Sequence, residues 1–419
     1  MRTIYLVRHG HIDIGPGHKS ICLGRKDVPL INEGVKQAER LAQYFRDKKI
    51  DAVYSSPLIR CLETARILAE KSGHKDLPIY IEEDFTEVDT GEWDGLPFTE
   101  LMEKYPEEYA ERGEHLGTYV IGGGESLEKA GERFAEAFEK VLAESYGDIL
   151  IVAHAGVIRS FLCRLTGTDT DDLLKLVVPA ASVTILEDME GDSSGGPESK
   201  EDDGSGESKG KEDDSSGGPG NKETNENRAT GIKASLRLRV TGLRPVQSIS
   251  LSEVDRMWAA CRVTAAQRRH MEAVADMAMK LIEYDIAQVR ADWLETVRPF
   301  GCTKLNVRAL YFAALLHDIK RSEGGGVHAE RGAEYLAGEG YLELAELVKT
   351  HHDPSVFAEG KPVSEAELLF LADKLVMEDR MVSIEERFAQ SRKKCKTPEA
   401  IENHERQYRA AMGIREKLP

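Results

Sequence analysis

Two histidines and two arginines in the first half of the chain have the types and positions needed to hold a phosphate group. Each lies just beyond a short apolar run, and the four residues are Arg8, His9, Arg60 and His154. Arginine forks bind phosphate oxygens in pairs, and a neutral imidazole can attack phosphorus while cations stabilise the charge on its oxygens. The pattern therefore indicates phosphoryl transfer through a histidine.

The elements that must position these residues are short strands alternating with helices. Four aliphatic runs bounded by polar residues predict buried strands, and they are Thr3–Val7, Ala52–Ser55, Pro78–Ile81 and Ile149–Ala153. Apolar residues at helical spacing predict helices over Asn32–Lys48 and Leu58–Lys71. This alternation predicts an α/β fold with three αβα layers and a mostly parallel sheet, whose carboxyl edge carries the active residues.

Further motifs extend this pattern in order over residues 1–188. They are Arg8-His9-Gly10, Leu23-Gly24, Ser55-Ser56-Pro57, Glu87, Gly124-Glu125-Ser126 and His154-Ala-Gly156. In this order the chain resembles the histidine phosphatase (phosphoglycerate-mutase-like) superfamily.

The resemblance implies a role for each residue of the site. His9 would be the nucleophile and Glu87 the general acid, which needs a raised pKa beside the dianionic ester. His154 would complete the catalytic set. Arg8, Gly10 and Arg60 would bind the phosphate, and no metal would be required.

Two departures from the superfamily pattern bear on the reaction. His11-Ile12-Asp13 replaces an acidic residue followed by a hydroxyl residue, and Arg112 stands between Glu87 and Gly124 where mutases carry an adjacent arginine pair. We therefore favour a phosphatase over a phosphoglycerate-type mutase. The motif spacing is most similar to the α-ribazole phosphatase branch.

A Gly/Ser/acidic tract separates the two halves of the chain. Gly191–Arg228 contains no aliphatic or aromatic residue, so it cannot bury enough surface to fold. The tract is either an interdomain linker or a long insertion at a hairpin tip between the alternating runs Ala181–Leu186 and Ala234–Val240. We favour the insertion, with a first domain at residues 1–248 (disordered at 190–230) and a second at 249–419.

The second half is predicted to be all-α and to end in a charged, frayed C-terminus. Its apolar spacing predicts helices over His270–Glu283, Asn306–His317, Ala329–Ala337, Leu342–His351 and Glu365–Glu378.

Histidines and aspartates at the ends of these apolar helices predict a metal site. A buried, unpaired carboxylate is costly, and a divalent cation compensates for it. The order His…His-Asp…Asp resembles the HD-domain phosphohydrolase superfamily over residues 265–385. The ligands implied are His270, His317, Asp318 and Asp373.

Other residues near this motif extend the site. His328 and His351 resemble ligands of a second metal, and His352 is the candidate to touch substrate phosphate. Fe, Mn, Co, Ni, Zn or Mg would suit the set, and the bound cation would acidify a water. Cations that could offset phosphate charge are Lys320, Arg321, Lys374 and Arg380.

Composition narrows the function classes. The 419 residues carry a formal charge of −18, which argues against a nucleic-acid polymer as partner. No apolar run reaches the ~20 residues of a membrane span, the N-terminus has no secretory pattern, and six scattered cysteines indicate reduced thiols. We expect a cytoplasmic enzyme acting on a small phosphorylated metabolite or nucleotide.

The two motifs together predict a bifunctional phosphohydrolase. The alternative for the second half is a non-catalytic HD module that senses a ligand and regulates the phosphatase. The sequence leaves the substrates, the metal and the oligomeric state open.

Overall fold

The computed structural model describes residues 1–13, 21–189, 235–282, 305–323, 327–357 and 363–418. The whole of the predicted disordered tract lies outside the described residues. The described residues group into two units, Met1–Val35 with Lys48–Thr241, and Lys36–Asp47 with Gly242–Pro419.

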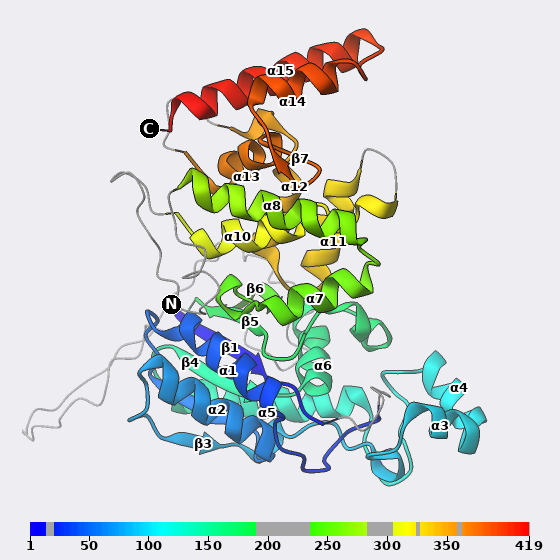
Figure 1. The fold of residues 1–419 in the computed structure, drawn as a ribbon. Coiled ribbons are helices and arrows are strands. Elements are labelled where there is room, and N and C mark those ends of the chain that lie inside the picture. The colour runs from blue at the N-terminus through cyan, green and yellow to red at the C-terminus, as the bar shows by residue number, and fades with distance from the viewer. Residues whose placement is uncertain (14–20, 190–234, 283–304, 324–326, 358–362, 419) are drawn as a thin grey trace, which may run out of the picture. The chain divides into compact units, whose positions relative to one another are not determined.

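The first unit is built on a six-stranded sheet of order β3-β2-β4-β1-β5-β6 (Figure 1). Its strands are β1 (Arg2–Arg8), β2 (Ala52–Ser55), β3 (Ile79–Ile81), β4 (Ile149–Ala153), β5 (Val183–Asp188) and β6 (Leu236–Leu243). The four predicted strands are all present. β1, β2, β3 and β4 are mutually parallel, whereas β5 runs antiparallel to β1. The expected mostly parallel α/β fold is confirmed.

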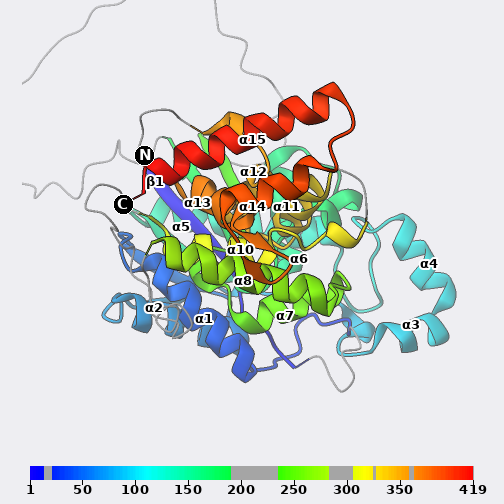
Figure 2. The same ribbon diagram turned by 45° about the horizontal axis from the view of Figure 1, so that its top comes forward.

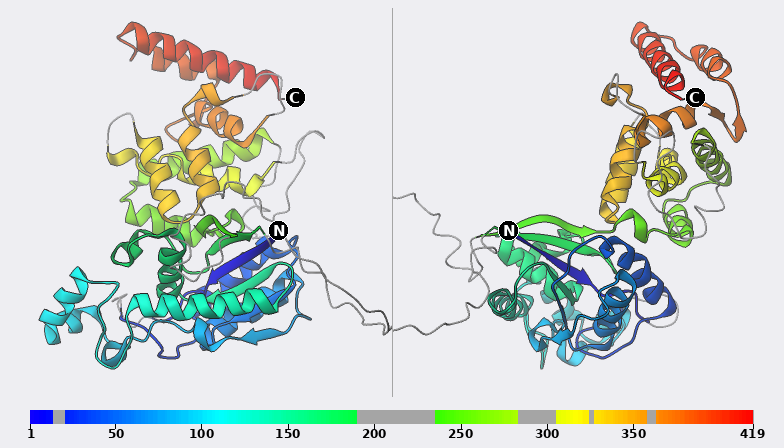
Figure 3. Two further views of the ribbon diagram at one scale, coloured as in Figure 1. Left: turned by 180° about the vertical axis from the view of Figure 1, so that it is seen from behind. Right: turned by 90° about the vertical axis from the view of Figure 1, so that its left-hand side faces the viewer.

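Helices cover both faces of this sheet, with α2 on one face and α5 and α6 on the other (Figure 3). Ile4 and Leu6 of β1 alternate with polar or opposite-facing residues and pack with Phe134, Phe138 and Phe161 in one core. The helices of this unit are α2 (Ile59–Ser72), α3 (Phe98–Lys104), α4 (Pro106–Glu114), α5 (Leu127–Glu144) and α6 (Ala155–Thr166). α1 (Asn32–Phe45) begins in this unit, and its residues from Lys36 on belong to the second.

The two alternating runs that flank the acidic tract lie side by side in the sheet. β6 is the neighbour of β5, and the Met189 N–H donates to the Ser235 carbonyl at 3.1 Å. The end of β5 thus meets the start of β6, so the two strands run antiparallel. The structure thus has the antiparallel strand pair that the hairpin prediction requires.

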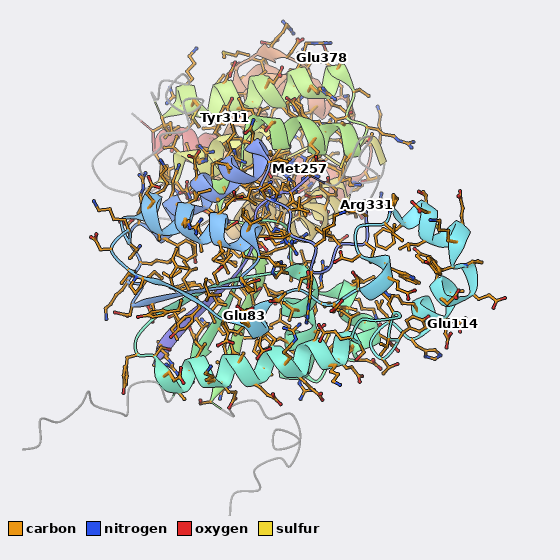
Figure 4. The ribbon with its side chains drawn as sticks, turned by 90° about the horizontal axis from the view of Figure 1, so that it is seen from below. Glu83, Glu114, Met257, Tyr311, Arg331 and Glu378 are labelled. Carbon is orange, nitrogen blue, oxygen red and sulfur yellow. The ribbon has the colours of Figure 1, made fainter. Side chains whose placement is uncertain are left out.

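The described residues of the second unit are helical apart from a short hairpin of two two-residue strands, β7 (Val376–Met377) and β8 (Arg380–Met381). Its helices are α7 (Leu251–Ala260), α8 (Ala265–Leu281), α10 (Val307–Leu316), α11 (His328–Gly338), α12 (Leu342–Thr350), α13 (Glu365–Lys374), α14 (Ile384–Arg392) and α15 (Pro398–Glu416). Figure 2 shows α8, α10 and α13 lying together. Met257 and Tyr311, labelled in Figure 4, are buried in the core of this unit.

Two predictions for this unit were wrong. The helix expected over Glu365–Glu378 ends at Lys374, because the chain turns there into the β7–β8 hairpin. The C-terminus is not frayed, since α15 spans 19 residues and buries Ala411 and Ile414. The Thr397 hydroxyl caps its first turn by accepting from the Ala400 N–H.

Among the described residues, no helix has both the length and the apolar character needed to cross a membrane.

Gly34 generates a prediction about the loop that carries the first histidine. A Cβ at Gly34 would lie 2.1 Å from the His11 carbonyl oxygen, which is backbone and cannot move aside alone. We expect Gly34→Ala to lower the free energy of unfolding by about 1–3 kcal/mol and to displace the loop after His9.

Gly113→Ala is the matched control, because nothing lies within 4 Å of a Cβ at this helical glycine. It should change stability by no more than about 1 kcal/mol. Urea unfolding compares the two variants, and equal stability would show that the close approach at Gly34 is absent.

Candidate functional site

Three adjacent strands deliver the predicted phosphate-binding residues to one edge of the sheet. β1 ends at Arg8 and precedes His9, β4 precedes His154, and the turn after β2 leads into α2 with Arg60 at its start. The His9 and His154 rings lie edge to face with centroids 5.2 Å apart. The structure therefore brings the two imidazoles together as the strand order requires.

Burial and hydrogen bonding keep the His9 imidazole neutral. Its Nδ1 lies 2.7 Å from the Gly10 carbonyl, which can only accept, so Nδ1 carries the proton and Nε2 keeps its lone pair. Burial lowers the pKa of His9 well below 6.5, and the positive charges of Arg8 and Arg60 act in the same direction.

Arg60 fixes the second imidazole. Its Nε donates to His154 Nδ1 at 3.1 Å, so the proton of neutral His154 sits on Nε2, which lies 2.7 Å from Ser56 Oγ. The other two guanidinium nitrogens donate to the Lys26 and Gly24 carbonyls at 2.9 and 2.8 Å. Burial, with Arg60 nearby, lowers the pKa of His154 well below 6.5.

Arg8 adds a second, partly buried cation. Its Nη1 donates to the Val178 carbonyl at 2.8 Å, while its Nε is buried without a hydrogen-bond partner among the described residues. Burial and the nearby Arg159 lower the pKa of Arg8 to about 10. A guanidinium with an unused buried donor suits an oxyanion such as phosphate.

Arg159 is the residue that sequence reasoning passed over. It lies on α6, its Nε donates to the Leu176 carbonyl at 2.8 Å, and burial lowers its pKa while the charge of Glu87 opposes that shift. Its position could have indicated a role in the site, because it lies in the first turns of α6, the helix that directly follows His154.

Glu87 is held at the start of α6. Its carboxylate accepts from the Gly156 N–H at 3.1 Å and from the Val157 N–H at 2.9 Å. These donors orient the carboxylate and stabilise its negative charge. The negative charge of Glu87 also acts on Arg8, where it raises the pKa of the guanidinium against the effect of burial.

Gly10 has a packing role in the described contacts. Its N–H donates to Thr64 Oγ1 at 3.2 Å, and a Cβ there would lie 2.5 Å from the Gly34 carbonyl oxygen. Glycine is needed because two backbones approach closely at this point.

In the second unit, seven histidine and aspartate side chains form one cluster, which we call the HD cluster. Its two groups of potential ligand atoms are His270, His317 and Asp373, and Asp318, His328, His351 and His352. Asp318 joins them, because one of its carboxylate oxygens lies 3.6 Å from His317 Nε2 and the other 3.2 Å from His328 Nε2.

Three imidazoles of the cluster are arranged as metal ligands would be. Nδ1 of His270, His317 and His351 lies 2.6, 2.8 and 2.5 Å from a backbone carbonyl, which fixes the proton on Nδ1. Their Nε2 atoms are buried and make no hydrogen bond with the described residues. Buried lone pairs that converge on two carboxylates fit a divalent cation, and the carbonyls are the outer partners that orient such ligands.

The charge states of Asp373 and His351 also fit a cation. Burial opposes ionisation, yet Lys374 and the surrounding histidines hold the pKa of Asp373 well below its usual range. Burial and the neighbouring His317 lower the pKa of His351 to about 3. Ionised carboxylates and neutral imidazoles are the forms that bind metal.

Of the cations expected near this site, two contact the cluster and two do not. Lys374 Nζ lies 2.7 Å from Asp373 Oδ2, and Arg321 Nη1 donates to Asp318 Oδ2. Lys320 instead lies over the Tyr335 ring, and Arg380 is exposed on β8. His352, expected at substrate phosphate, is also within ligand range, with its Nε2 3.0 Å from His328 Nε2.

Comparisons with known proteins identify both halves of the chain. The family model described as histidine phosphatase superfamily (branch 1) matches residues 4–194, and the HD domain model matches residues 268–378. Both resemblances inferred from the motifs are confirmed.

Relatives of the first half include phosphatases and mutase-like proteins. Phosphoserine phosphatase 1 of Hydrogenobacter thermophilus is 32% identical over 44% of this chain and 86% of its own length. Phosphoglycerate mutase-like protein 4 of Arabidopsis thaliana is 37% identical over 38% of this chain and 70% of its own. The solved α-ribazole phosphatase of Shigella flexneri shares 26% identity over 44% of this chain and 90% of its own, with a TM-score of 0.40.

The lowered pKa values of His9 and His154 predict the behaviour of both rings on acidification. Each ring should stay neutral as pH falls from about 8 to about 6, so its NMR signals should not titrate with a midpoint near 6.5. His9→Gln and His154→Gln spectra assign the signals, and a midpoint near 6.5 for either would contradict the buried arrangement.

The same shifts set a direction for stability. The unfolded state takes up these protons first, so the pair contributes stability that is fully present above about pH 6.5 and is lost as pH falls below it.

The HD cluster predicts stoichiometric metal binding. His317→Gln removes a buried ligand, and we expect it to retain well under half of the metal that the unmodified chain holds after loading and dialysis. Elemental analysis measures the content. His9→Gln, a like change in the other unit, is the control, and equal metal content in the two variants would remove the case for this site.

Proposed function

The chain belongs to the histidine phosphatase superfamily through residues 4–194 and carries an HD domain at residues 268–378. On that premise we propose that it is a bifunctional phosphohydrolase, with a phosphomonoesterase site at His9 and a metal-dependent hydrolase site at the HD cluster. The observation that carries the first activity is the edge-to-face pair of His9 and His154, held beside Arg60.

The residues of the first site divide the phosphoryl transfer between them. His9 Nε2 attacks phosphorus, the bond to the ester oxygen breaks, and a proton from Glu87 goes to the departing oxygen. Arg8 and Arg60 balance the charge on the phosphoryl oxygens, and His154 keeps its proton on Nε2. Water assisted by Glu87 then releases phosphate from His9. This half needs no metal.

The position of Arg112 supports a phosphatase over a mutase. Its guanidinium lies over the Trp93 ring, 5.9 Å from the centroid, so it is stacked against the aromatic cluster of α3 and α4. The segment between Glu87 and Gly124 contains one arginine, and its guanidinium is stacked on an aromatic ring. The second phosphate of a bisphosphorylated acid would therefore find no pair of guanidinium groups there. The substrate we propose is a small phosphomonoester, as in α-ribazole phosphatases.

For the second site, the ligands would be His270, His317, Asp318 and Asp373, joined by His328 and His351 for a second ion. A divalent cation of Fe, Mn, Co, Ni, Zn or Mg held there would supply Lewis acidity and lower the pKa of a coordinated water. The backbone carbonyls at the Nδ1 atoms keep the imidazoles oriented. The substrate class is a phosphate ester or nucleotide.

The alternative role of the HD domain is ligand sensing without turnover. The buried Nε2 atoms favour catalysis, because three unused lone pairs aimed at two carboxylates are costly unless they bind a cation.

We also propose that the domains divide at residue 248 and that the enzyme works in the cytoplasm. The five described cysteines are free thiols, which supports that location.

One variant pair tests the proposed division of labour in the full-length chain. His9→Ala should lower hydrolysis of an aryl phosphate by at least about a thousandfold, because the neighbouring His154 has its Nδ1 lone pair engaged by Arg60 and cannot replace the nucleophile. Asp318→Asn should leave that activity within about twofold, and so should a chelator.

The reciprocal result is expected for metal-dependent hydrolysis of a nucleotide panel, which Asp318→Asn should abolish and His9→Ala should spare. Full aryl phosphatase activity in His9→Ala would refute the nucleophile. Absence of any metal-dependent turnover, with metal still bound, would favour the sensing alternative.

A further inference from the structure

A pocket of about 520 Å³ opens beside the HD cluster, and we call it the α15 pocket. Its volume is in the range of roughly 300–1,000 Å³ that is usual for small-molecule sites. Its lining comes from α11, α12, α13, α15 and the turn after α12, and the residues are Ala329, Glu330, Lys349, His352, Asp353, Lys374, Asn403, Arg406 and Gln407.

The far wall of the pocket lies outside the matched HD domain. Asn403, Arg406 and Gln407 all belong to α15, whereas the HD match ends at residue 378. α15 contacts α13 and the short turn Pro354–Val356, and buries Ala411 and Ile414. A helix added to the domain therefore supplies side chains to a pocket at the metal ligands.

The pocket is continuous with the cluster through two residues. His352 belongs both to the pocket wall and to the potential metal ligands. Lys374 lines the pocket while its Nζ lies 2.7 Å from Asp373 Oδ2 and 3.2 Å from His352 Nδ1. A phosphate group held at the cluster would therefore project its next substituent into the α15 pocket.

Three cations from three helices and two carboxylates, Glu330 and Asp353, face this space, so the cations outnumber the carboxylates by one. Lys349 comes from α12, Lys374 from α13 and Arg406 from α15. Lys374 Nζ already forms a hydrogen bond with Asp373. Among the described residues, which include the whole HD cluster, Lys349 and Arg406 form no ion pair or hydrogen bond with that cluster. The Arg406 guanidinium is oriented within its own helix, where Nη2 donates to Asn403 Oδ1 at 2.9 Å.

The lining also indicates what the rest of the ligand is. Ala329 is its one apolar residue, and the Asn403 and Gln407 amides lie one turn apart on the helix that carries Arg406. Such a wall suits phosphate oxygens and hydroxyl groups better than a large hydrophobic or aromatic leaving group.

We propose that the α15 pocket binds the second phosphate of a phosphoanhydride substrate, such as a nucleoside di- or polyphosphate, through Lys349 and Arg406. The first phosphate lies at the HD cluster beside Lys374. The position of the first phosphate rests on the proposed function of the HD cluster. The position of the second phosphate rests on the lining of the α15 pocket. α15 is then the element that selects an anhydride over a monoester.

Binding tests the proposal without relying on turnover. The probes are AMP and the α,β-methylene analogue of ADP, which differ by one phosphate and are titrated calorimetrically into the metal-loaded full-length chain. We expect the analogue to bind about tenfold or more tightly than AMP, and Arg406→Gln and Lys349→Gln each to remove most of that preference while leaving AMP affinity within about twofold.

Arg409→Gln is the matched control, because Arg409 is exposed on the same helix and does not line the pocket. Any binding of the probes at the first unit contributes equally to all variants. The quantity to compare is therefore the difference in affinity between Arg406→Gln and Arg409→Gln. Thermal unfolding confirms that the variants are folded.

The outcomes separate this inference from the proposed function. Equal affinities for the two probes, or an Arg406→Gln titration identical to that of Arg409→Gln, would overturn the pocket assignment whether or not the HD domain hydrolyses anything. A phosphate-dependent preference that Arg406→Gln removes supports the pocket even if no metal-dependent turnover is found, in which case only the catalytic proposal fails.

Discussion

The hydrogen bond from Arg60 to His154 is the interaction on which the first site depends. A buried guanidinium must find acceptors, and Arg60 has three: an imidazole nitrogen and two backbone carbonyls. By taking the His154 Nδ1 lone pair, it keeps that ring neutral and fixed. Burial, together with the charges of Arg8 and Arg60, keeps His9 neutral, so two imidazoles and two guanidinium groups can share one site.

The HD cluster meets the same constraint by another route. Here backbone carbonyls, not a guanidinium, fix the protons on His270, His317 and His351 and turn their Nε2 lone pairs inward. The lone pairs face two carboxylates, which repel one another unless a cation lies between them. One unit therefore concentrates positive charge around imidazoles and the other concentrates negative charge, and this difference suits a metal-free site and a metal site respectively.

Much of this arrangement could be predicted, because short buried strands and the residues just beyond them leave a local pattern. The ends of β1 and β4 placed His9 and His154, and the HD order placed His317 and Asp318. The chemistry of neighbouring elements was harder to see. Arg159 looks like any helical arginine, and the charged C-terminal sequence predicts a frayed end although α15 buries Ala411 and Ile414. Its role depends on which helices it meets, which sequence periodicity does not encode.

The central claim is that phosphate is carried on His9 during turnover. Rapid alkaline quenching of the full-length chain with an aryl phosphate, followed by peptide mass spectrometry, tests it directly, because phosphohistidine survives in base. The account predicts a phosphoryl group on the peptide that contains His9, and its absence from the same peptide in His9→Ala. Turnover with no covalent phosphate at this position, under conditions where the second step is slowed by Glu87→Gln, would contradict it.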